Sequence, residues 1–274
     1  MTKPTVKIIA LDMDGTLLTT DKRLTERNRA ALQRASDHGA YVVPVTGRIF
    51  RGLPQVVLEL PFLRYAITSN GASVYDAKAD AVLYRAEIDN ARALEIMRWL
   101  DGQPVIYDCY MEDRGWMTEA MWNQIERYAA SPIVVDYMRS VRTPVPDLKA
   151  FVAQRGSDVQ KIQAFCLEEE TQRRLLGGLP FDRLAVSSSV PRNVEINHED
   201  ANKGKALLAL AKHLNVSREQ VMAFGDGLND MSMIVDAGIG VAMGNATDDI
   251  RRAADLVTAS NDDDGVAAVV EGLF

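Results

Sequence analysis

Two stretches of the chain, one near each end, alternate short apolar, β-branched segments with segments whose apolar residues recur at helical spacing. The expected elements are strands at residues 6–14, 41–46, 65–75, 220–226 and 239–243, and helices at 25–38 and 203–214. Strands that alternate with helices and are apolar on both faces are typical of a parallel sheet covered by helices on both sides. The sequence therefore predicts an α/β fold whose core is a doubly wound, mostly parallel sheet.

The residues between these stretches have a different pattern. They predict a hairpin at 72–85, a helix at 88–100, paired strands over 105–119 and further strands and helices up to residue 197. Residues 131–148 carry three of the ten prolines and are expected to form a loop or an edge connection. We therefore expect a split core, residues 1–84 and 194–274, with an α+β domain inserted at residues 85–193.

Charge and composition exclude several classes of protein. With 31 basic and 38 acidic residues the net charge is −7, which disfavours binding to nucleic acid or to anionic membranes. No apolar run approaches the roughly 18 residues that span a bilayer, and the start of the chain lacks the pattern of a signal peptide. The two cysteines, Cys109 and Cys166, are too few for a disulfide scaffold. A soluble, cytoplasmic protein without nucleic-acid or membrane partners is expected.

Acidic residues follow two of the expected strands. The segment Asp12-Met13-Asp14-Gly15-Thr16 comes after the first strand, and Gly225-Asp226-Gly227-Leu228-Asn229-Asp230 comes after a later one. Ligand sites of open α/β sheets lie beyond the carboxyl ends of the strands, and clustered carboxylates suit a hard cation such as Mg²⁺. The alternatives are a strand-ending turn with solvated carboxylates and a helix cap formed by Asn229 or Asp230.

Two further segments carry groups that could hold a phosphate. Thr46-Gly47-Arg48 ends the second strand, where a hydroxyl and a closely approaching glycine amide are available, although a simple turn is the alternative. Lys203 stands near the start of a helix, where a cation opposes the helix dipole. That mismatch indicates a functional charge, and an ordinary lysine at a helix start is the alternative.

In their order along the chain, these motifs resemble those of the haloacid dehalogenase superfamily of phosphatases, in its Cof-type branch with a large α+β cap. The matching segments are DMDGTLL at 12–18, VTGR at 45–48, SNGA at 69–72, NKG at 202–204 and GDGLND at 225–230. Gly227 departs from the pattern, since close relatives often carry Asn there.

The resemblance implies a Mg²⁺-dependent phosphatase in which Asp12 is the nucleophile and forms an aspartyl-phosphate. Asp14 would act as general acid and then as general base. The metal would be held by Asp12, the backbone carbonyl of Asp14, Asp226 and Asp230. The phosphoryl oxygens would be bound by Lys203, Thr46, Asn229 and the backbone amides of Met13 and Gly47.

The expected substrates are small phosphorylated metabolites, with sugar phosphates favoured by the resemblance. The inserted domain is expected to act as a cap that contacts the leaving group. The candidate substrate contacts are Arg48, Asn70, Arg114, Trp116 and His198. Ordinary surface or core packing is the alternative for each of the cap residues.

Other functions remain open at this point. A phosphotransferase or hexose-phosphate mutase would use the same site. A phosphorylated signalling receiver also combines acidic residues, Mg²⁺ and Lys, but such modules are shorter and carry the phosphoacceptor on a middle strand. A catalytically silent metabolite-binding protein is disfavoured because both Asp12 and Asp14 are present.

Overall fold

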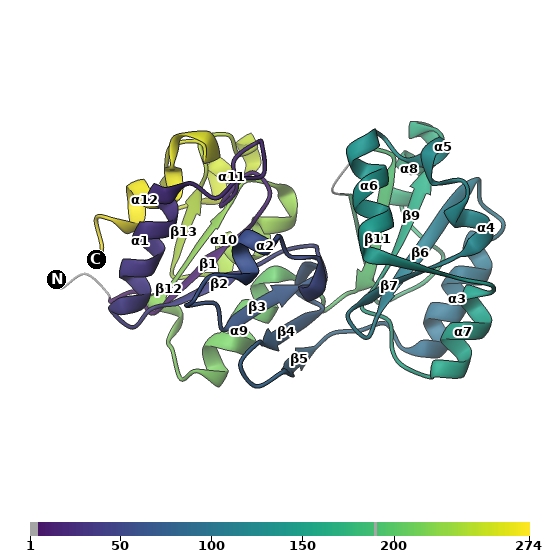
Figure 1. Ribbon diagram of the computed structural model, residues 1–274, viewed down its shortest axis with the longest axis horizontal. Coiled ribbons are helices and arrows are strands. Elements are labelled where there is room, and N and C mark those ends of the chain that lie inside the picture. The colour runs from purple at the N-terminus through teal and green to yellow at the C-terminus, as the bar shows by residue number, and fades with distance from the viewer. Residues whose placement is uncertain (1–4, 189–190) are drawn as a thin grey trace. The chain divides into compact units, whose positions relative to one another are not determined.

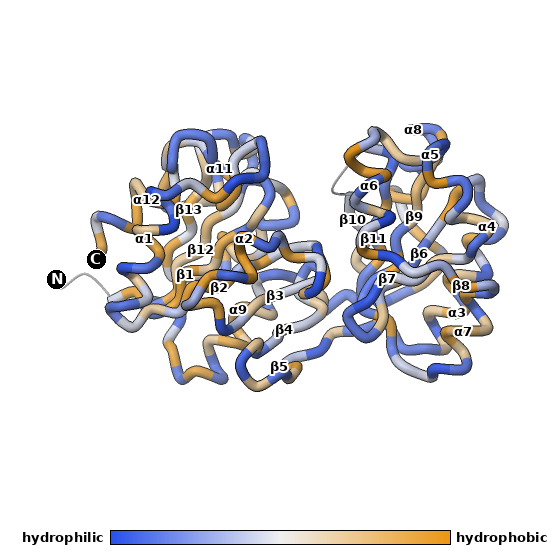
Figure 2. Tube along the Cα trace, viewed as in Figure 1, coloured by the Kyte–Doolittle hydropathy of each residue, from blue (hydrophilic) through white to orange (hydrophobic). Residues whose placement is uncertain are grey.

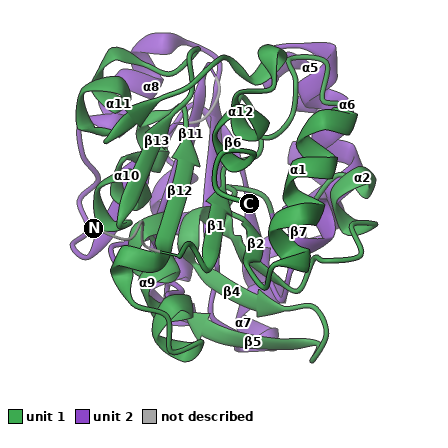
Figure 3. Ribbon diagram, turned by 90° about the vertical axis from the view of Figure 1, so that its left-hand side faces the viewer, with its two compact units in different colours: residues 1–48, 53–85, 202–274 green, residues 49–52, 86–201 purple. Residues whose placement is uncertain are grey.

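The structure, a computed structural model, describes residues 5–188 and 191–274. The chain forms two compact units (Figure 3). Unit 1 comprises Met1–Arg48, Leu53–Arg85 and Asn202–Phe274, and unit 2 comprises Ile49–Gly52 and Ala86–Ala201. The predicted return to the core at residue 194 therefore differs from the structure, in which residues 194–201 belong to unit 2.

A five-stranded parallel sheet forms the centre of unit 1, with the strand order β14-β13-β12-β1-β2 (Figure 1). Its strands are β1 (Ile8–Leu11), β2 (Tyr41–Pro44), β12 (Val221–Gly225), β13 (Ile239–Ala242) and β14 (Leu256–Val257). Strand β1 is central and buried, and Ile8 is in register with Val221 on one side and Tyr41 on the other. Residues that follow β1, β2 and β12 are therefore expected at one edge of the sheet.

Helices cover both faces of this sheet. They are α1 (Glu26–Asp37), α2 (Gln55–Leu58), α9 (Lys203–His213), α10 (Met231–Asp236), α11 (Asp248–Ala253) and α12 (Gly265–Val270). One apolar cluster joins α1 and α12 to side chains such as Ile9 and Phe224, and another joins α9 to Ile8 and Ala10. Figure 2 shows apolar residues concentrated along the central strands β1 and β12. The predicted α/β, doubly wound core is confirmed.

A smaller antiparallel sheet completes unit 1. It consists of β3 (Tyr65–Thr68), β4 (Ser73–Asp76) and β5 (Ala81–Arg85), and it contains the predicted hairpin. A parallel bridge between Val45 and Ile67 joins β3 to the segment after β2. The short 3₁₀ turn Ser69–Gly71 connects β3 to β4 and therefore lies near the carboxyl end of the main sheet.

Unit 2 is built on a six-stranded sheet in the order β10-β11-β9-β6-β7-β8. The strands are β6 (Val105–Met111), β7 (Arg114–Thr118), β8 (Arg142–Val145), β9 (Lys161–Cys166), β10 (Leu184–Ser187) and β11 (Asn193–His198). The helices are α3 (Asn90–Leu100), α4 (Glu119–Trp122), α5 (Ile125–Tyr128), α6 (Pro132–Val141), α7 (Leu148–Arg155) and α8 (Glu169–Leu176). Helices α3 and α7 pack on one face of the sheet, and α5 and α6 pack on the other.

Helix α6 occupies the proline-rich segment that was expected to be a loop. Ser131 caps the helix by accepting a hydrogen bond from the N–H of Val134, and Pro132 stands in the first turn. A proline there removes only an N–H that has no partner within the helix. Pro132 thus begins a helix, and Pro144 lies in the edge strand β8. In the part of the chain that the structure describes, every helix is too short or too polar to cross a bilayer.

Candidate active site

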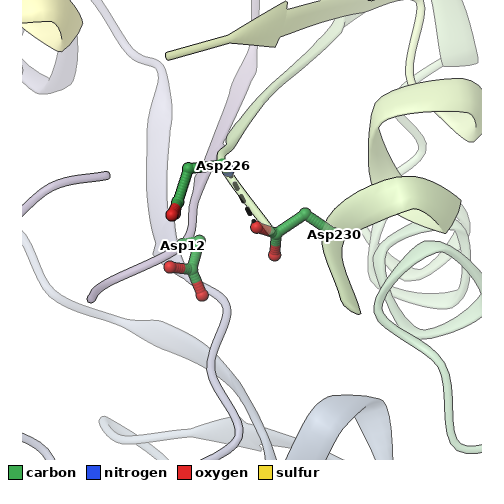
Figure 4. Close-up of side chains that lie close together, drawn as sticks. All are labelled: Asp12, Asp226 and Asp230. Atoms are coloured by element: carbon green, nitrogen blue, oxygen red, sulfur yellow. Dashed lines mark hydrogen bonds between the residues drawn. The ribbon is translucent and has the colours of Figure 1, made fainter. Parts of the chain in front are cut away.

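Three carboxylates meet at the carboxyl ends of β1 and β12. Asp12 directly follows β1, and its N–H donates to the carbonyl of Phe224 at 3.1 Å, which fixes it beside β12. Oxygens of Asp12, Asp226 and Asp230 lie within 4.8 Å of one another, and Figure 4 shows the three side chains converging. Asp230 is oriented by the N–H groups of Asp226 and Gly227, each 3.0 Å from its Oδ2. The two acidic segments of the sequence therefore form one cluster.

Lys203 is the buried cation of this cluster. Its Nζ lies 2.5 Å from Asp12 Oδ1 and 2.6 Å from Asp230 Oδ1, and its side chain is 0% exposed. Asn202 caps α9 by accepting the N–H of Lys205, which places Lys203 at the first position of the helix. Burial opposes the charge of Lys203, but the two carboxylates outweigh burial and raise the pKa of its ammonium. The unfavourable position at the helix start is thus explained by two ion pairs.

The crowded carboxylates have perturbed proton affinities. Burial and the nearby Asp230 raise the pKa of Asp12 to about 8, although Lys203 opposes this rise. Burial and Asp230 also raise the pKa of Asp226 to about 6, against the hydrogen bond from the hydroxyl of Thr16. Three convergent carboxylates with a single ammonium carry a net negative charge, which a divalent cation with oxygen ligands would neutralise. The donor set therefore fits such a metal.

Asp14 lies in a different environment. Its carboxylate accepts from Arg48 Nη2 at 3.0 Å and forms an ion pair with Lys22 Nζ at 2.9 Å. Burial raises the pKa of Asp14, but Arg48 and Lys22 together outweigh burial and hold the pKa below its ordinary value. Its side chain remains 37% exposed. The pKa values of Asp12 and Asp14, two carboxylates separated by one residue, are thus shifted in opposite directions.

The segment after β2 and the turn after β3 bind one another. The buried hydroxyl of Thr46 accepts a hydrogen bond from the N–H of Arg48 at 3.2 Å. The backbone carbonyl of Thr46 accepts one from the N–H of Asn70 at 3.0 Å. A Cβ on Gly47 would lie 2.8 Å from Asn70 Oδ1. The predicted residues Thr46, Gly47, Arg48 and Asn70 are therefore brought together.

Gly71 connects this turn to the start of α9. It has φ +94°, and a Cβ there would lie 2.3 Å from the carbonyl oxygen of Asn202. Only glycine fits both the left-handed backbone and so close an approach. The SNGA and NKG motifs, distant in sequence, thus pack directly on one another just where Lys203 leaves the backbone.

The sequence matches the family of haloacid dehalogenase-like hydrolases over residues 9–270. The chain belongs to this family. The predicted resemblance to haloacid dehalogenase superfamily phosphatases is therefore confirmed, and the chain is a phosphoric monoester hydrolase of that superfamily.

Named relatives of this haloacid dehalogenase-like hydrolase span nearly the whole chain. Phosphatase YwpJ of Bacillus subtilis (strain 168) is 32% identical, over 98% of this chain and 100% of the relative. The 5-amino-6-(5-phospho-D-ribitylamino)uracil phosphatase YcsE of the same organism is 30% identical, over 97% of this chain and 94% of the relative. A solved haloacid dehalogenase-like hydrolase from B. subtilis has a TM-score of 0.84 at 31% identity, over 98% of this chain and 100% of that one.

Two of the expected phosphate-binding residues of this hydrolase contribute little side-chain chemistry to the cluster. The side chain of Met13 is 0% exposed and packs in the core of unit 1, which leaves its backbone for the predicted role. Asn229 is exposed on the 3₁₀ turn Leu228–Asp230, directly before Asp230, which is one of the three clustered carboxylates. Its position in the loop, rather than a contact, connects it with the site.

Three of the candidate substrate contacts lie in unit 2. Trp116 packs in the core of that unit, where its indole N–H donates to the carbonyl of Met111 at 3.2 Å. His198 is partly buried, and its Nδ1 accepts the N–H of Asp200 at 3.1 Å. Arg114 is exposed at the start of β7.

Other contacts of the cluster were missed by the sequence analysis. The Thr16 hydroxyl donates to Asp226 Oδ1 at 2.9 Å, and this threonine belongs to the D-x-D-G-T motif, so the motif itself offered a signal. Lys22, by contrast, lies in an irregular loop with no motif around it. The ion pair between Lys22 and Asp14 depends on how that loop folds back, which local patterns do not reveal.

Proposed function

We propose that this haloacid dehalogenase superfamily enzyme is a Mg²⁺-dependent phosphatase of small phosphorylated metabolites, sugar phosphates first, and that it forms an aspartyl-phosphate on Asp12. The observation that carries the proposal is the buried Asp12 carboxylate, which is held 2.5 Å from Lys203 beside two further carboxylates. A buried nucleophile next to a cation and an acidic metal cluster suits attack on a dianionic phosphate.

Mg²⁺ would be held by Asp12, Asp226, Asp230 and the backbone carbonyl of Asp14. The raised pKa values of Asp12 and Asp226 support this, because burial and the neighbouring Asp230 carboxylate raise them and a cation bound among these groups would favour their charged forms. When bound, the cation would neutralise charge between the nucleophile and the phosphate and polarise the phosphoryl oxygens.

In the first step a carboxylate oxygen of Asp12 attacks phosphorus, and the bond to the leaving-group oxygen breaks. That oxygen takes a proton from Asp14 and departs as an alcohol. In the second step a water molecule attacks the phosphorus of the aspartyl-phosphate and gives a proton to Asp14. Inorganic phosphate leaves, and the carboxylate of Asp12 is restored.

Asp14 must carry a proton in the first step, whereas Arg48 and Lys22 favour its carboxylate form. A phosphate dianion is a strong partner for a guanidinium. We therefore propose that bound substrate draws Arg48 toward the phosphate and relieves part of this bias, so that Arg48 serves both as a substrate contact and as a partner of Asp14.

Lys203, the Thr46 hydroxyl, Asn229 and the amides of Met13 and Gly47 would bind the phosphoryl oxygens. Lys203 is suited to this because its position is fixed by two carboxylates before substrate arrives. Preorganised charges of this kind stabilise the transition state without a reorganisation cost during the reaction.

Substrate choice is assigned to unit 2, with Asn70 from unit 1, as a cap function. Arg114 and His198 are the better candidates for substrate contacts, because Trp116 is already part of an apolar core. The name of YcsE describes a phosphatase of a phosphorylated ribityl compound, which supports a polyol or sugar phosphate as substrate. An acidic chain that acts on such metabolites suits the cytoplasm.

The test is phosphate release from a panel of sugar phosphates, nucleotides, cofactor phosphates and p-nitrophenyl phosphate, with Mg²⁺ and with EDTA. Asp12→Asn should abolish turnover and keep the fold, because the amide has the same shape and Lys203 retains Asp230. Asp21→Asn is the matched control, since Asp21 lies in the following loop with its side chain 78% exposed. Substantial Mg²⁺-dependent turnover by Asp12→Asn would refute the nucleophile.

A further inference from the structure

The turn that follows β1 is held by two side chains from the C-terminal part of the chain. The carbonyl of Gly15 accepts a hydrogen bond from Asn245 Nδ2 at 2.8 Å, and the carbonyl of Leu18 accepts one from Asn261 Nδ2 at 3.0 Å. Asn245 lies in the turn after β13, and Asn261 is only 4% exposed. Two amide donors therefore hold this turn, one near its middle and one at its end.

The two asparagines are also bonded to each other. Asn245 Oδ1 accepts the backbone N–H of Asn261 at 3.0 Å. Asn245 thus uses its amide nitrogen toward Gly15 and its amide oxygen toward Asn261. An aspartate in its place would keep the acceptor, but it would set a carboxylate oxygen against the carbonyl of Gly15, where a donor is required.

The Gly15 peptide is coupled tightly to the site. Gly15 has φ +93°, and a Cβ there would lie 2.5 Å from Asp226 Oδ2. The carbonyl that Asn245 bonds belongs to the peptide that joins Gly15 to Thr16, and Asp14 is joined to the N–H side of Gly15. A rotation of that peptide therefore reaches the backbone that carries the Asp14 carboxylate through the backbone dihedrals of Gly15. On its other side Asp14 is restrained by the short turn in which Leu17 donates to the carbonyl of Asp12 at 3.1 Å.

We propose that Asn245 is a positioning residue, which fixes the Gly15 peptide so that the carboxyl group of Asp14 meets the departing oxygen of the substrate. The proposal rests on the function proposed above. The side-chain amide of Asn245 bonds to the backbone of Gly15 and of Asn261, so its effect on Asp14 passes through the backbone of the turn.

The choice of leaving group in the substrate distinguishes a misplaced Asp14 from general damage to the site. An alkyl phosphate such as a hexose phosphate releases an alkoxide that needs the proton of Asp14, whereas p-nitrophenolate leaves readily without it. General acid catalysis contributes roughly 10²- to 10⁴-fold, and a misplacement of about 1 Å can cost about 10²-fold. We expect Asn245→Asp to lower kcat/KM for the alkyl phosphate by about 10²-fold and for p-nitrophenyl phosphate by only a few fold.

The experiment compares kcat/KM of the full chain for these two substrates, because this constant reports only the steps up to release of the leaving group. The variants are Asn245→Asp, Asn245→Ala and the control Asn123→Asp, which adds the same charge at a residue of unit 2. Thermal unfolding shows whether each variant is folded. Selective loss with the alkyl phosphate in both Asn245 variants, and not in the control, supports the proposal.

Equal losses with both substrates would overturn it, because they would mean general damage to the site, and unchanged constants would overturn it as well. The proposed function has its own check in the same assay. If wild type shows no Mg²⁺-dependent release, or if Asp12→Asn retains release, the function fails, and the role of Asn245 fails with it. If wild type shows Mg²⁺-dependent release and Asp12→Asn does not, the Asn245 variants test only the role of Asn245.

Discussion

Replacing Lys203 by Ala tests whether a buried ammonium organises the site. Lys203 makes two contacts, 2.5 Å to Asp12 and 2.6 Å to Asp230, with its side chain 0% exposed. Loss of one preorganised electrostatic group in a water-poor site costs about 10²- to 10³-fold in kcat, or about 2.7–4 kcal/mol. We expect kcat of Lys203→Ala to fall by at least this range, because Asp12, the proposed nucleophile, also loses the partner that orients it.

The same change lowers stability in a pH-dependent way. Removing one partner of a buried ion pair costs about 3–5 kcal/mol, because the remaining charge stays buried without compensation. Asp12 can relieve this cost by taking up a proton. Lys203 lowers the pKa of Asp12, so without Lys203 that pKa rises further above its ordinary value. The loss of stability should therefore be small in acid and grow as the pH rises.

The assay measures kcat for p-nitrophenyl phosphate at saturating Mg²⁺, together with thermal unfolding in mildly acidic and mildly alkaline buffer. Lys205→Ala is the matched control, because Lys205 lies two residues further along α9 and is exposed. A folded Lys203→Ala enzyme with kcat close to wild type would refute the reasoning. So would a loss of stability that is larger in acid than in alkali.

Two further predictions concern the metal-free protein and the glycine turn. In the folded protein the pKa values of Asp12 and Asp226 are about 8 and about 6, above the ordinary value of 3.8. Protonation of these groups therefore stabilises the folded state fully below pH 3.8, and this stabilisation is lost as the pH rises through the two folded pKa values. With EDTA the Tm should therefore fall between about pH 5 and about pH 9, and Mg²⁺ should restore it most in alkali; a Tm that rises over this range would contradict the assignment. Gly71→Ala should cost clearly more stability than Gly39→Ala and should also lower kcat, since both glycines have positive φ but only at Gly71 would a Cβ meet a backbone oxygen at 2.3 Å. Unfolding midpoints and kcat of the two variants check this, and equal behaviour would show that φ strain alone matters.

The sequence predicts the central sheet because its strands are buried on both faces. IIAL of β1 and VMAFG of β12 are nearly continuous apolar runs, and each is followed at once by an acidic residue. Since parallel neighbours end at the same edge, the meeting of Asp12 and Asp226 follows from the topology. Local pattern and tertiary structure agree here, which is why the prediction succeeds.

The predictions fail where a residue's role depends on its position in an element or on the sheet that an element joins. Pro132 suggests a loop by composition, but with Ser131 as a cap it begins helix α6. Strand β11 has a strand pattern that does not reveal its partner. It pairs with β9 and β10 in unit 2, and so the predicted boundary at residue 194 differs from the boundary between the two units.

The same limit applies within the site, and it bears on mechanism. The sequence shows two carboxylates, Asp12 and Asp14, on either side of one residue, and nothing local distinguishes their proton affinities. Burial and Asp230 raise the pKa of Asp12, whereas Arg48 and Lys22 outweigh burial and lower that of Asp14. Each of these partners comes from another segment of the chain. Neighbouring acids whose environments drive their pKa values apart are suited to different roles in catalysis. The opposite pKa shifts of the two carboxylates are therefore created by the fold. If Asp12 is the nucleophile and Asp14 the acid–base, as proposed, the cations beside Asp14 must yield to substrate before that residue can donate a proton.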